Sequence, residues 1–168
     1  MRKVESPQGR WQNIVFFLTA LLIVTADQLS KAWIRDNLDV GKSLPETGLF
    51  QLSHVQNTGV AFGLFQNHSF PLTIVIVIGT AIILLFTLFI YRRLPLSNIR
   101  LGKPALGLVL GGTIGNLIDR LRLGYVTDFL DISIWPAFNI ADSSVVVGVI
   151  LFAYSLFATT RVKNSLSA

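Results

Sequence analysis

The chain has 168 residues, of which 52% are hydrophobic and 14% are charged. Soluble domains average about 25% charged residues, so this composition indicates a protein dissolved in lipid, and the length suits one compact helical bundle. The formal net charge of +5 does not indicate nucleic-acid binding, because the basic residues lie between and beyond apolar runs. The absence of Cys excludes disulfides and thiolate metal sites, and two His disfavour a His-rich metal site.

Four apolar stretches are candidates for membrane spans. A helix needs roughly 20 mostly apolar residues to cross a bilayer, and backbone groups in lipid must find partners within their own segment. The predicted spans cover residues 11–29, 70–91, 104–118 and 143–160, the third being short. We therefore predict an all-α polytopic membrane protein with four transmembrane helices. Residues 1–168 would form a single membrane domain with a small strand-containing platform outside the cytoplasm.

The first span has a competing interpretation as a cleaved signal peptide. Basic residues precede it, and Val24-Thr25-Ala26 resembles a small-residue cleavage site. A retained span is favoured, because cleavage there would remove the apolar run that pairs best with the other three.

Lysine and arginine predict the orientation. With four spans, both termini and the loop after the second span share one side, which holds nine of the 14 basic residues. The positive-inside rule assigns that side to the cytoplasm. The acids have the opposite distribution, with only Glu5 on the inner side. The sequence thus predicts an inner-membrane-type protein that works at its outer face.

The first outer segment covers residues 30–69. Residues 31–35 could form a short interfacial helix, and residues 50–54 alternate apolar and polar side chains as a strand does. Residues 57–59 form a turn signal, Asn-Thr-Gly. Residues 60–65 are apolar and uncharged, so they either contact lipid or a lipid-like ligand or pack against the helix ends.

The second outer segment covers residues 119–142, and residues 125–134 within it are predicted to be extended chain. Side chains of a strand alternate between faces, which would turn Asp128 and Asp131 to opposite sides. Trp135 fits an interfacial anchor. We interpret residues 136–139 as the turn before the last helix.

The third span carries a seam of small residues that allows close helix contact. Its glycines recur every four residues, at Gly107, Gly111 and Gly115. Asp119 ends this helix, where a carboxylate opposes the helix dipole and needs a partner. Lys31 or Arg120 could serve as that partner.

Four acids, Asp27, Asp119, Asp128 and Asp142, lie at or near predicted span ends. Charges at membrane depth are costly and mark function by default. If two of these carboxyls converge in a partly apolar site, one pKa rises, and an acid and a base coexist near neutral pH. Such a pair can activate water against a peptide carbonyl. The alternative is a set of structural ion pairs and helix caps.

Two other functions use the same residues. A small transporter or proton-relay subunit would use intramembrane acids, but it predicts acids stepped through the bilayer, whereas these cluster at one face. A serine protease could use Ser30 with Lys31, yet neighbouring residues on a helix do not face each other. Ser143 fits a helix start instead.

Five motifs in order resemble those of lipoprotein signal peptidase, the bacterial signal peptidase II. They are Asp27-Gln-Leu-Ser-Lys31, Asn57-Thr-Gly-Val-Ala-Phe62, Gly111-Gly-Thr-Ile-Gly-Asn116-Leu-Ile-Asp119-Arg120, Val126-Thr-Asp128-Phe129 and Phe138-Asn139-Ile-Ala-Asp142-Ser143. Each motif alone is weak, but five with the expected spacing over residues 20–150 are specific.

The resemblance implies a multi-pass aspartyl endopeptidase of the bacterial inner membrane, with both termini in the cytoplasm and the active site at the outer face. It would cut the signal peptide from prolipoproteins just before a Cys that carries diacylglycerol. The family's catalytic pair falls on Asp128 and Asp142. Positions that shape the site or bind substrate fall on Asp27, Lys31, Asn57, Asn116, Asp119, Arg120 and Asn139. The resemblance implies no metal and no cofactor, membrane lipid as a partner, and inhibition by cyclic peptides of the globomycin class.

Overall fold

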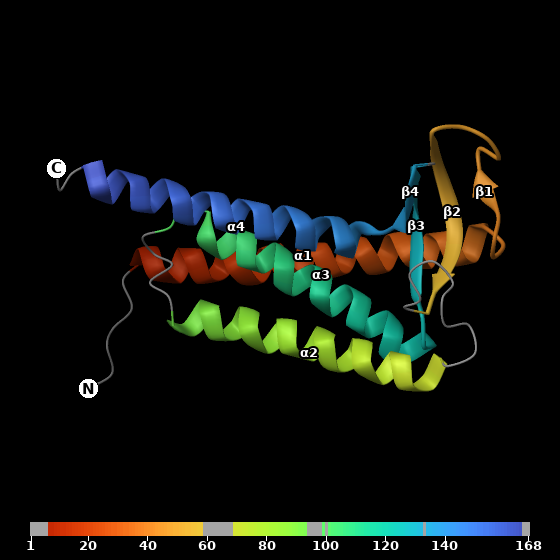
Figure 1. Cartoon of the computed structure of the whole chain (residues 1–168), viewed down its shortest axis with the longest axis horizontal. Helices are drawn as coiled ribbons and strands as arrows, with labels where there is room; N and C mark the ends of the chain where they lie inside the picture. Colours follow the sequence, from red (N-terminus) through yellow and green to blue (C-terminus); the bar gives the residue numbers. More distant parts are fainter. Residues whose placement is uncertain (1–6, 59–68, 94–98, 100, 133, 166–168) are drawn as a thin grey trace.

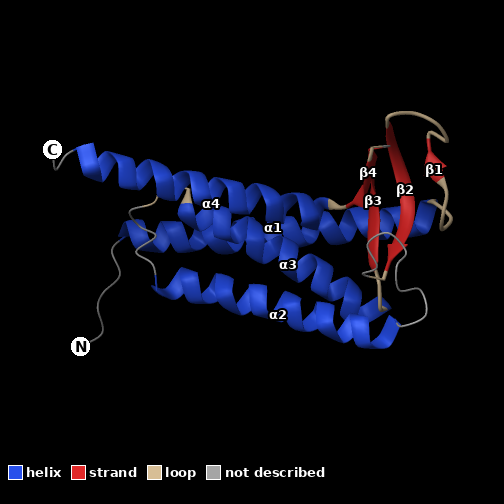
Figure 2. Ribbon diagram, in the orientation of Figure 1, coloured by secondary structure: helices blue, strands red, loops and turns tan. Residues whose placement is uncertain are grey.

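The computed structural model describes residues 7–58, 69–93, 99, 101–132 and 134–165. Within these ranges, four long helices lie side by side, and a small antiparallel sheet stands across one end of the bundle (Figures 1 and 2). The helices are α1 (Pro7–Asn37), α2 (Ser69–Arg93), α3 (Gly102–Leu123) and α4 (Ile140–Ser165). The strands are β1 (Ser43–Leu44), β2 (Phe50–Asn57), β3 (Val126–Ile132) and β4 (Trp135–Phe138).

The sheet has the strand order β1-β2-β3-β4, and every neighbouring pair is antiparallel. It confirms the predicted strand character of residues 50–54 and the extended chain after residue 125. Val55 of β2 pairs with Asp128 of β3, and the register shifts between Leu52 and Val55. The predicted apolar run at residues 60–65 lies outside the described residues.

The first helix is longer than the predicted span. A separate interfacial helix at residues 31–35 was wrong, because α1 continues without a break to Asn37. No Gly or Pro interrupts residues 30–37. An ion pair between Asp27 and Lys31, one helical turn apart, joins the end of the apolar run to the charged residues that follow it. Charged residues end an apolar run, but they do not end a helix.

The last two helices also differ from prediction at their outer ends. Residues 120–123 extend α3 to Leu123, and Gly124 caps the helix in the left-handed conformation, φ 79°. Its N–H donates to the carbonyl of Arg120 at 3.1 Å. Residues 136–138 were predicted as a turn but belong to β4, which leads directly into α4. The turn signal from Pro136 was misleading because β4 is an edge strand, where proline is tolerated.

The predicted glycine seam is confirmed, and it binds α3 to α1. A Cβ atom at Gly107 would lie 2.7 Å from the carbonyl oxygen of Phe16, and one at Gly111 would lie 2.7 Å from that of Ala20. A Cβ atom at Gly112 would lie closer still to the carbonyl oxygen of Ala141 at the start of α4. Only glycine permits these approaches, which bring three helices together beneath the sheet.

The helix surfaces are apolar and exposed. Among the described residues, two helical stretches are long and apolar enough to cross a membrane, Gly9–Asn37 of α1 and Ile140–Thr159 of α4, and Ile78–Arg92 of α2 is a shorter apolar stretch. Large side chains such as Leu22, Phe86 and Phe157 are more than 60% exposed on them. The predicted helical fold with a small sheet is confirmed, whereas the number of membrane crossings stays a prediction.

Candidate active site

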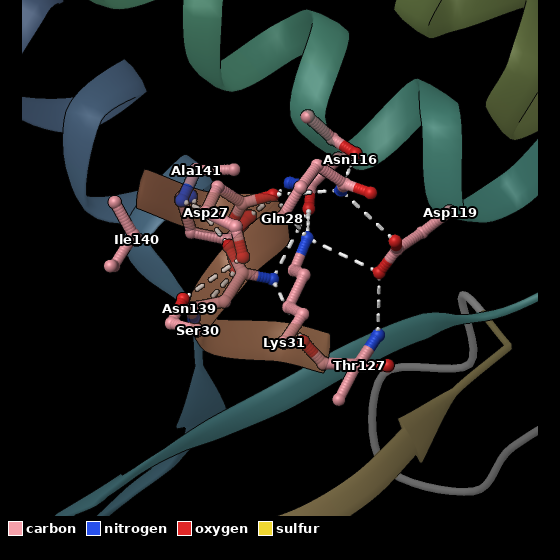
Figure 3. Close-up of polar contacts among 12 residues, drawn as sticks. Asp27, Gln28, Ser30, Lys31, Asn116, Asp119, Thr127, Asn139, Ile140 and Ala141 are labelled. Atoms are coloured by element: carbon pink, nitrogen blue, oxygen red, sulfur yellow. Dashed lines mark hydrogen bonds and ion pairs between the residues drawn. The ribbon is translucent and has the colours of Figure 1, made fainter. Parts of the chain in front are cut away.

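Polar side chains converge in the interior where the helix ends meet the sheet (Figure 3). Six of the nine residues predicted for the site are at most 8% exposed: Asp27, Lys31, Asn116, Asp119, Asp128 and Asn139. The remaining three are half-buried: Asn57, Arg120 and Asp142. Buried polar groups are costly unless they are hydrogen-bonded or paired, so their partners determine what this cluster can do.

The start of α4 is closed by reciprocal hydrogen bonds between Asn139 and Asp142. The backbone N–H of Asp142 donates to Asn139 Oδ1 at 2.9 Å, and the backbone N–H of Asn139 donates to Asp142 Oδ2 at 3.3 Å. This is a capping box, in which the N-cap residue and the third helical residue satisfy each other's N–H groups. Asp27 Oδ1 accepts a further bond there, from Ala141 N–H at 3.0 Å. Both carboxylates therefore lie at the positive end of the helix dipole.

Asp128 lies on β3, is 2% exposed and is held by amide groups. Asn57 Nδ2 donates to one carboxyl oxygen at 2.8 Å, and Asn139 Nδ2 donates to the other at 2.7 Å. In the described part of the chain, no Lys or Arg forms an ion pair with it. Burial raises the pKa of Asp128 from 3.8 to about 6; the hydrogen bond from Asn57 opposes this shift, and the charge of Asp142 reinforces it.

One side chain connects the two predicted catalytic residues. Asn139 donates from Nδ2 to Asp128 and accepts at Oδ1 from the backbone of Asp142. Asn116 Nδ2 donates to Asp142 Oδ1 at 2.7 Å, while Asn116 Oδ1 accepts from Lys31 Nζ at 2.9 Å. An ammonium group can only donate, so Lys31 fixes which end of the Asn116 amide faces Asp142. The two carboxyls are thus held by donors of defined orientation.

A buried ion cluster lies between α1 and α3 (Figure 3). It is linked through Asn116 to Asp142, which together with Asp128 makes up the candidate dyad. Lys31 Nζ is 2.8 Å from Asp27 Oδ2 and 3.3 Å from Asp119 Oδ2. Gln28 Nε2 lies 3.2 Å from the first acid, 3.1 Å from the second and 3.1 Å from the carbonyl of Gly115. The prediction that Lys31 could pair with Asp119 is confirmed.

Arg120, the other predicted partner of Asp119, has a broader electrostatic role. Its guanidinium donates to the carbonyl of Asn116 at 3.4 Å. It is also attracted to three carboxylates, Asp142, Asp128 and Asp119. It therefore supplies positive charge to the whole site.

Three residues of this network were missed by the sequence analysis: Gln28, Arg35 and Thr127. Arg35 lies four residues beyond Lys31, so helical spacing from Asp27 could have placed it on the same face. Gln28 occurs within a quoted motif without an assigned role. Thr127 is fully buried next to Asp128, and nothing in its sequence context indicates that it binds a charged residue.

The hydroxyls considered for a serine mechanism are committed to helix backbone. Ser30 Oγ donates to the carbonyl of Asp27 at 2.9 Å, and Ser143 Oγ donates to that of Asn139 at 3.0 Å. Lys31 Nζ is paired with two carboxylates, so it does not serve as the base of a serine nucleophile. The arrangement gives a serine nucleophile no activating partner among the described residues.

Comparisons with known proteins agree on one family. A family model described as Signal peptidase (SPase) II matches residues 19–158. A lipoprotein signal peptidase of Dehalococcoides mccartyi is 50% identical over 139 residues, 83% of this chain and 86% of the relative. One of Moorella thermoacetica is 49% identical over 142 residues, 84% and 91% of the two chains. A solved structure described as a bacterial membrane enzyme has a TM-score of 0.74 and 31% identity, covering 86% of this chain and 88% of its own.

Proposed function

Since the chain belongs to the signal peptidase II family, we propose that it is an aspartyl endopeptidase that cleaves lipoprotein precursors within the membrane. Membership makes the protein a peptidase and a membrane enzyme that removes lipoprotein signal peptides. The proposal adds the mechanism, the catalytic residues, the position of the cut and the topology.

The observation that carries the mechanism is the bridge through Asn139. One amide group contacts Asp128 and the backbone of Asp142, while Asp142 itself accepts from Asn116 and from Asn139 N–H. Two carboxyls held together without a dedicated cation will share a proton more readily than they will both ionise. A pair of this kind provides an acid and a base at one site.

The proposed reaction uses the pair in its singly protonated form. The ionised carboxylate takes a proton from a water molecule, and the water oxygen attacks the scissile carbonyl carbon. The protonated carboxyl donates its proton to the carbonyl oxygen, which gives a tetrahedral diol. Collapse of this intermediate returns a proton to the leaving nitrogen and breaks the C–N bond. The raised pKa of Asp128 favours it as the proton holder, so Asp142 is assigned the role of the base in this scheme.

The other motif positions are proposed to support this pair. Asn57, Asn116 and Asn139 orient the two carboxyls by direct hydrogen bonds. The cluster of Asp27, Lys31 and Asp119 fixes the helices that carry them. Arg120 balances part of the negative charge. None of these roles calls for a metal or a cofactor.

The proposed topology has four membrane-spanning helices in a single domain. The N-terminal end of α1 and the C-terminal end of α4 lie at the same end of the bundle, opposite the sheet (Figure 1). The C-terminal end of α2, which carries Arg92, and the beginning of α3, which carries Lys103, are on that same side. By the positive-inside rule this end faces the cytoplasm, so the sheet and the dyad face outward from a bacterial inner membrane.

The proposed substrate is a prolipoprotein whose Cys carries diacylglycerol, and the cut falls just before that Cys. The exposed apolar surface of the helices continues up to the level of the sheet, where Leu29 and Trp33 of α1 are more than half exposed. The acyl chains of the substrate would therefore stay against this apolar helix surface while its peptide reaches Asp128. Cyclic peptides of the globomycin class are expected to compete for this position.

The proposal is tested by incubating the purified protein in detergent or lipid with a diacylglyceryl-modified prolipoprotein and following the gel shift of the product. Cleavage should require the diacylglyceryl group, because the lipid places the scissile bond at the interface. The unmodified precursor of the same sequence is the matched control. Equal cleavage of both precursors would remove the lipid requirement, and no cleavage of either would contradict the proposed function.

A further inference from the structure

Arg35 lies in the last turn of α1 and contacts the strand residue that precedes Asp128. We propose that Arg35 is a positioning residue for the dyad, which acts by holding Thr127 and thereby fixes the place of Asp128 on β3. This inference rests on the aspartyl function proposed above, and it adds a residue that the motifs do not include.

Thr127 is held on two sides by charged groups. Arg35 Nη1 donates to Thr127 Oγ1 at 3.0 Å, and the backbone N–H of Thr127 donates to Asp119 Oδ2 at 3.0 Å. The contact to Asp119 is visible in Figure 3. Arg35 Nη1 also lies 3.8 Å from Asp119 Oδ1, which closes a triangle of contacts. Thr127 is completely buried, and only 21% of the Arg35 side chain is exposed.

The ladder between β2 and β3 is interrupted on one side of this part of β3. The register between β2 and β3 shifts between Leu52 and Val55, immediately beside the residue pair that contains Asp128. A bulge disrupts the ladder locally and bends the strand. Thr127 pairs with Gln56 in the ladder, and Arg35 and Asp119 add contacts from outside the sheet at this residue, which together set the position of the adjacent Asp128.

A simpler role for Arg35 would be favourable interaction with the dipole at the end of α1. That role requires only positive charge near the helix end, and it predicts no link to Thr127. Arg122 offers a matched control, because it lies in the last turn of α3 and is exposed. Its removal deletes the same charge at the same end of the bundle.

The experiment compares steady-state cleavage of the modified prolipoprotein by Arg35→Met, Thr127→Val, the double variant, Thr127→Ser and Arg122→Met. Arg35→Met and Thr127→Val should each lower kcat about 10-fold with little change in KM, because a displaced reacting group slows chemistry more than binding. The double variant should be no slower than the less active of the two single variants, because both substitutions break the same contact. Thr127→Ser, which keeps the hydroxyl, and Arg122→Met should stay within about twofold of the parent.

Several results would overturn the inference while leaving the aspartyl mechanism intact. They are full activity of Arg35→Met or Thr127→Val, a double variant whose loss is the product of the single losses, or a Thr127→Ser variant as slow as Thr127→Val. If Arg35→Met does not fold, the contrast between the valine and serine variants still decides the matter. Failure of the proposed function would appear differently, as retained cleavage by Asp128→Asn and Asp142→Asn.

Discussion

The molecule holds its buried carboxylates in two different ways. In the ion cluster, Asp27 and Asp119 share the ammonium group of Lys31, so each negative charge faces a positive one. In the dyad, Asp128 and Asp142 are held by side-chain and backbone amides. Neutral donors orient a carboxylate and stabilise its ionised form less than a charged partner does. The cluster therefore pairs opposite charges inside the protein, whereas Asp128 and Asp142 have no ion-pair partner among the described residues and exchange a proton in the proposed mechanism.

The largest expected effect is loss of cleavage on neutralising the dyad. Asp128→Asn and Asp142→Asn each keep the shape but remove the proton exchange that activates water, so cleavage should fall by at least about 10³-fold. Activity is measured by gel shift of the modified prolipoprotein, and folding by thermal unfolding and by binding of a globomycin-type inhibitor. If both variants remained active, the aspartyl mechanism would have to be abandoned.

Removing the cation of the ion cluster should affect folding more than chemistry. Lys31→Met leaves Asp27 and Asp119 buried without their ammonium partner, which typically costs about 3–5 kcal/mol. The free energy of unfolding should fall by that order, and the melting temperature in detergent should fall with it. Lys42→Met, at an exposed lysine, is the control. An unchanged melting temperature for Lys31→Met would show that the ion cluster does not stabilise the fold.

The pH dependence of stability should separate the two regions further. The pKa of Asp128 is raised to about 6 by burial, so between about pH 4 and 6 the native state binds more protons than the unfolded state. Stability therefore falls as the pH rises through this window, by about 2–3 kcal/mol for this group. Asp128→Asn, which cannot ionise, should lack that part of the decline.

The measurement is the difference in unfolding free energy between parent and Asp128→Asn from pH 4 to 7.5. The absolute offset is not informative, because the amide nitrogen of Asn must face a donor from Asn57 or Asn139. The slope is informative. A parent and variant with parallel profiles would mean that Asp128 ionises normally in the folded protein.

Much of this organisation could be predicted from the sequence, and the remainder has identifiable physical causes. Apolar run length located four helices, and alternation located β2. The helix ends were misplaced because Lys31, Arg35 and Asp119 form ion pairs inside the protein and α3 is closed by a glycine cap, neither of which hydropathy detects. Motifs supplied Asp128 and Asp142 as candidates. The network through Gln28 and Thr127 depends on contacts between segments about 90 residues apart, which spacing cannot reveal.

The smallest expected effect tests which face of β3 carries the chemistry. Asp131 lies three residues beyond Asp128, so strand alternation turns it the other way. It pairs with Gln51 across the sheet and accepts from Ser53 Oγ at 3.4 Å, a contact at the long limit of a hydrogen bond. It is half-buried, and no contact to the residues that hold the dyad is seen for it within the described ranges. Asp131→Asn should therefore keep cleavage within about threefold of the parent and change the unfolding free energy by less than about 1 kcal/mol. Because the substitution is chemically identical to Asp128→Asn, the pair of variants differs only in position. An inactive Asp131→Asn beside an active Asp128→Asn would assign the catalytic carboxyl to the opposite face of the strand.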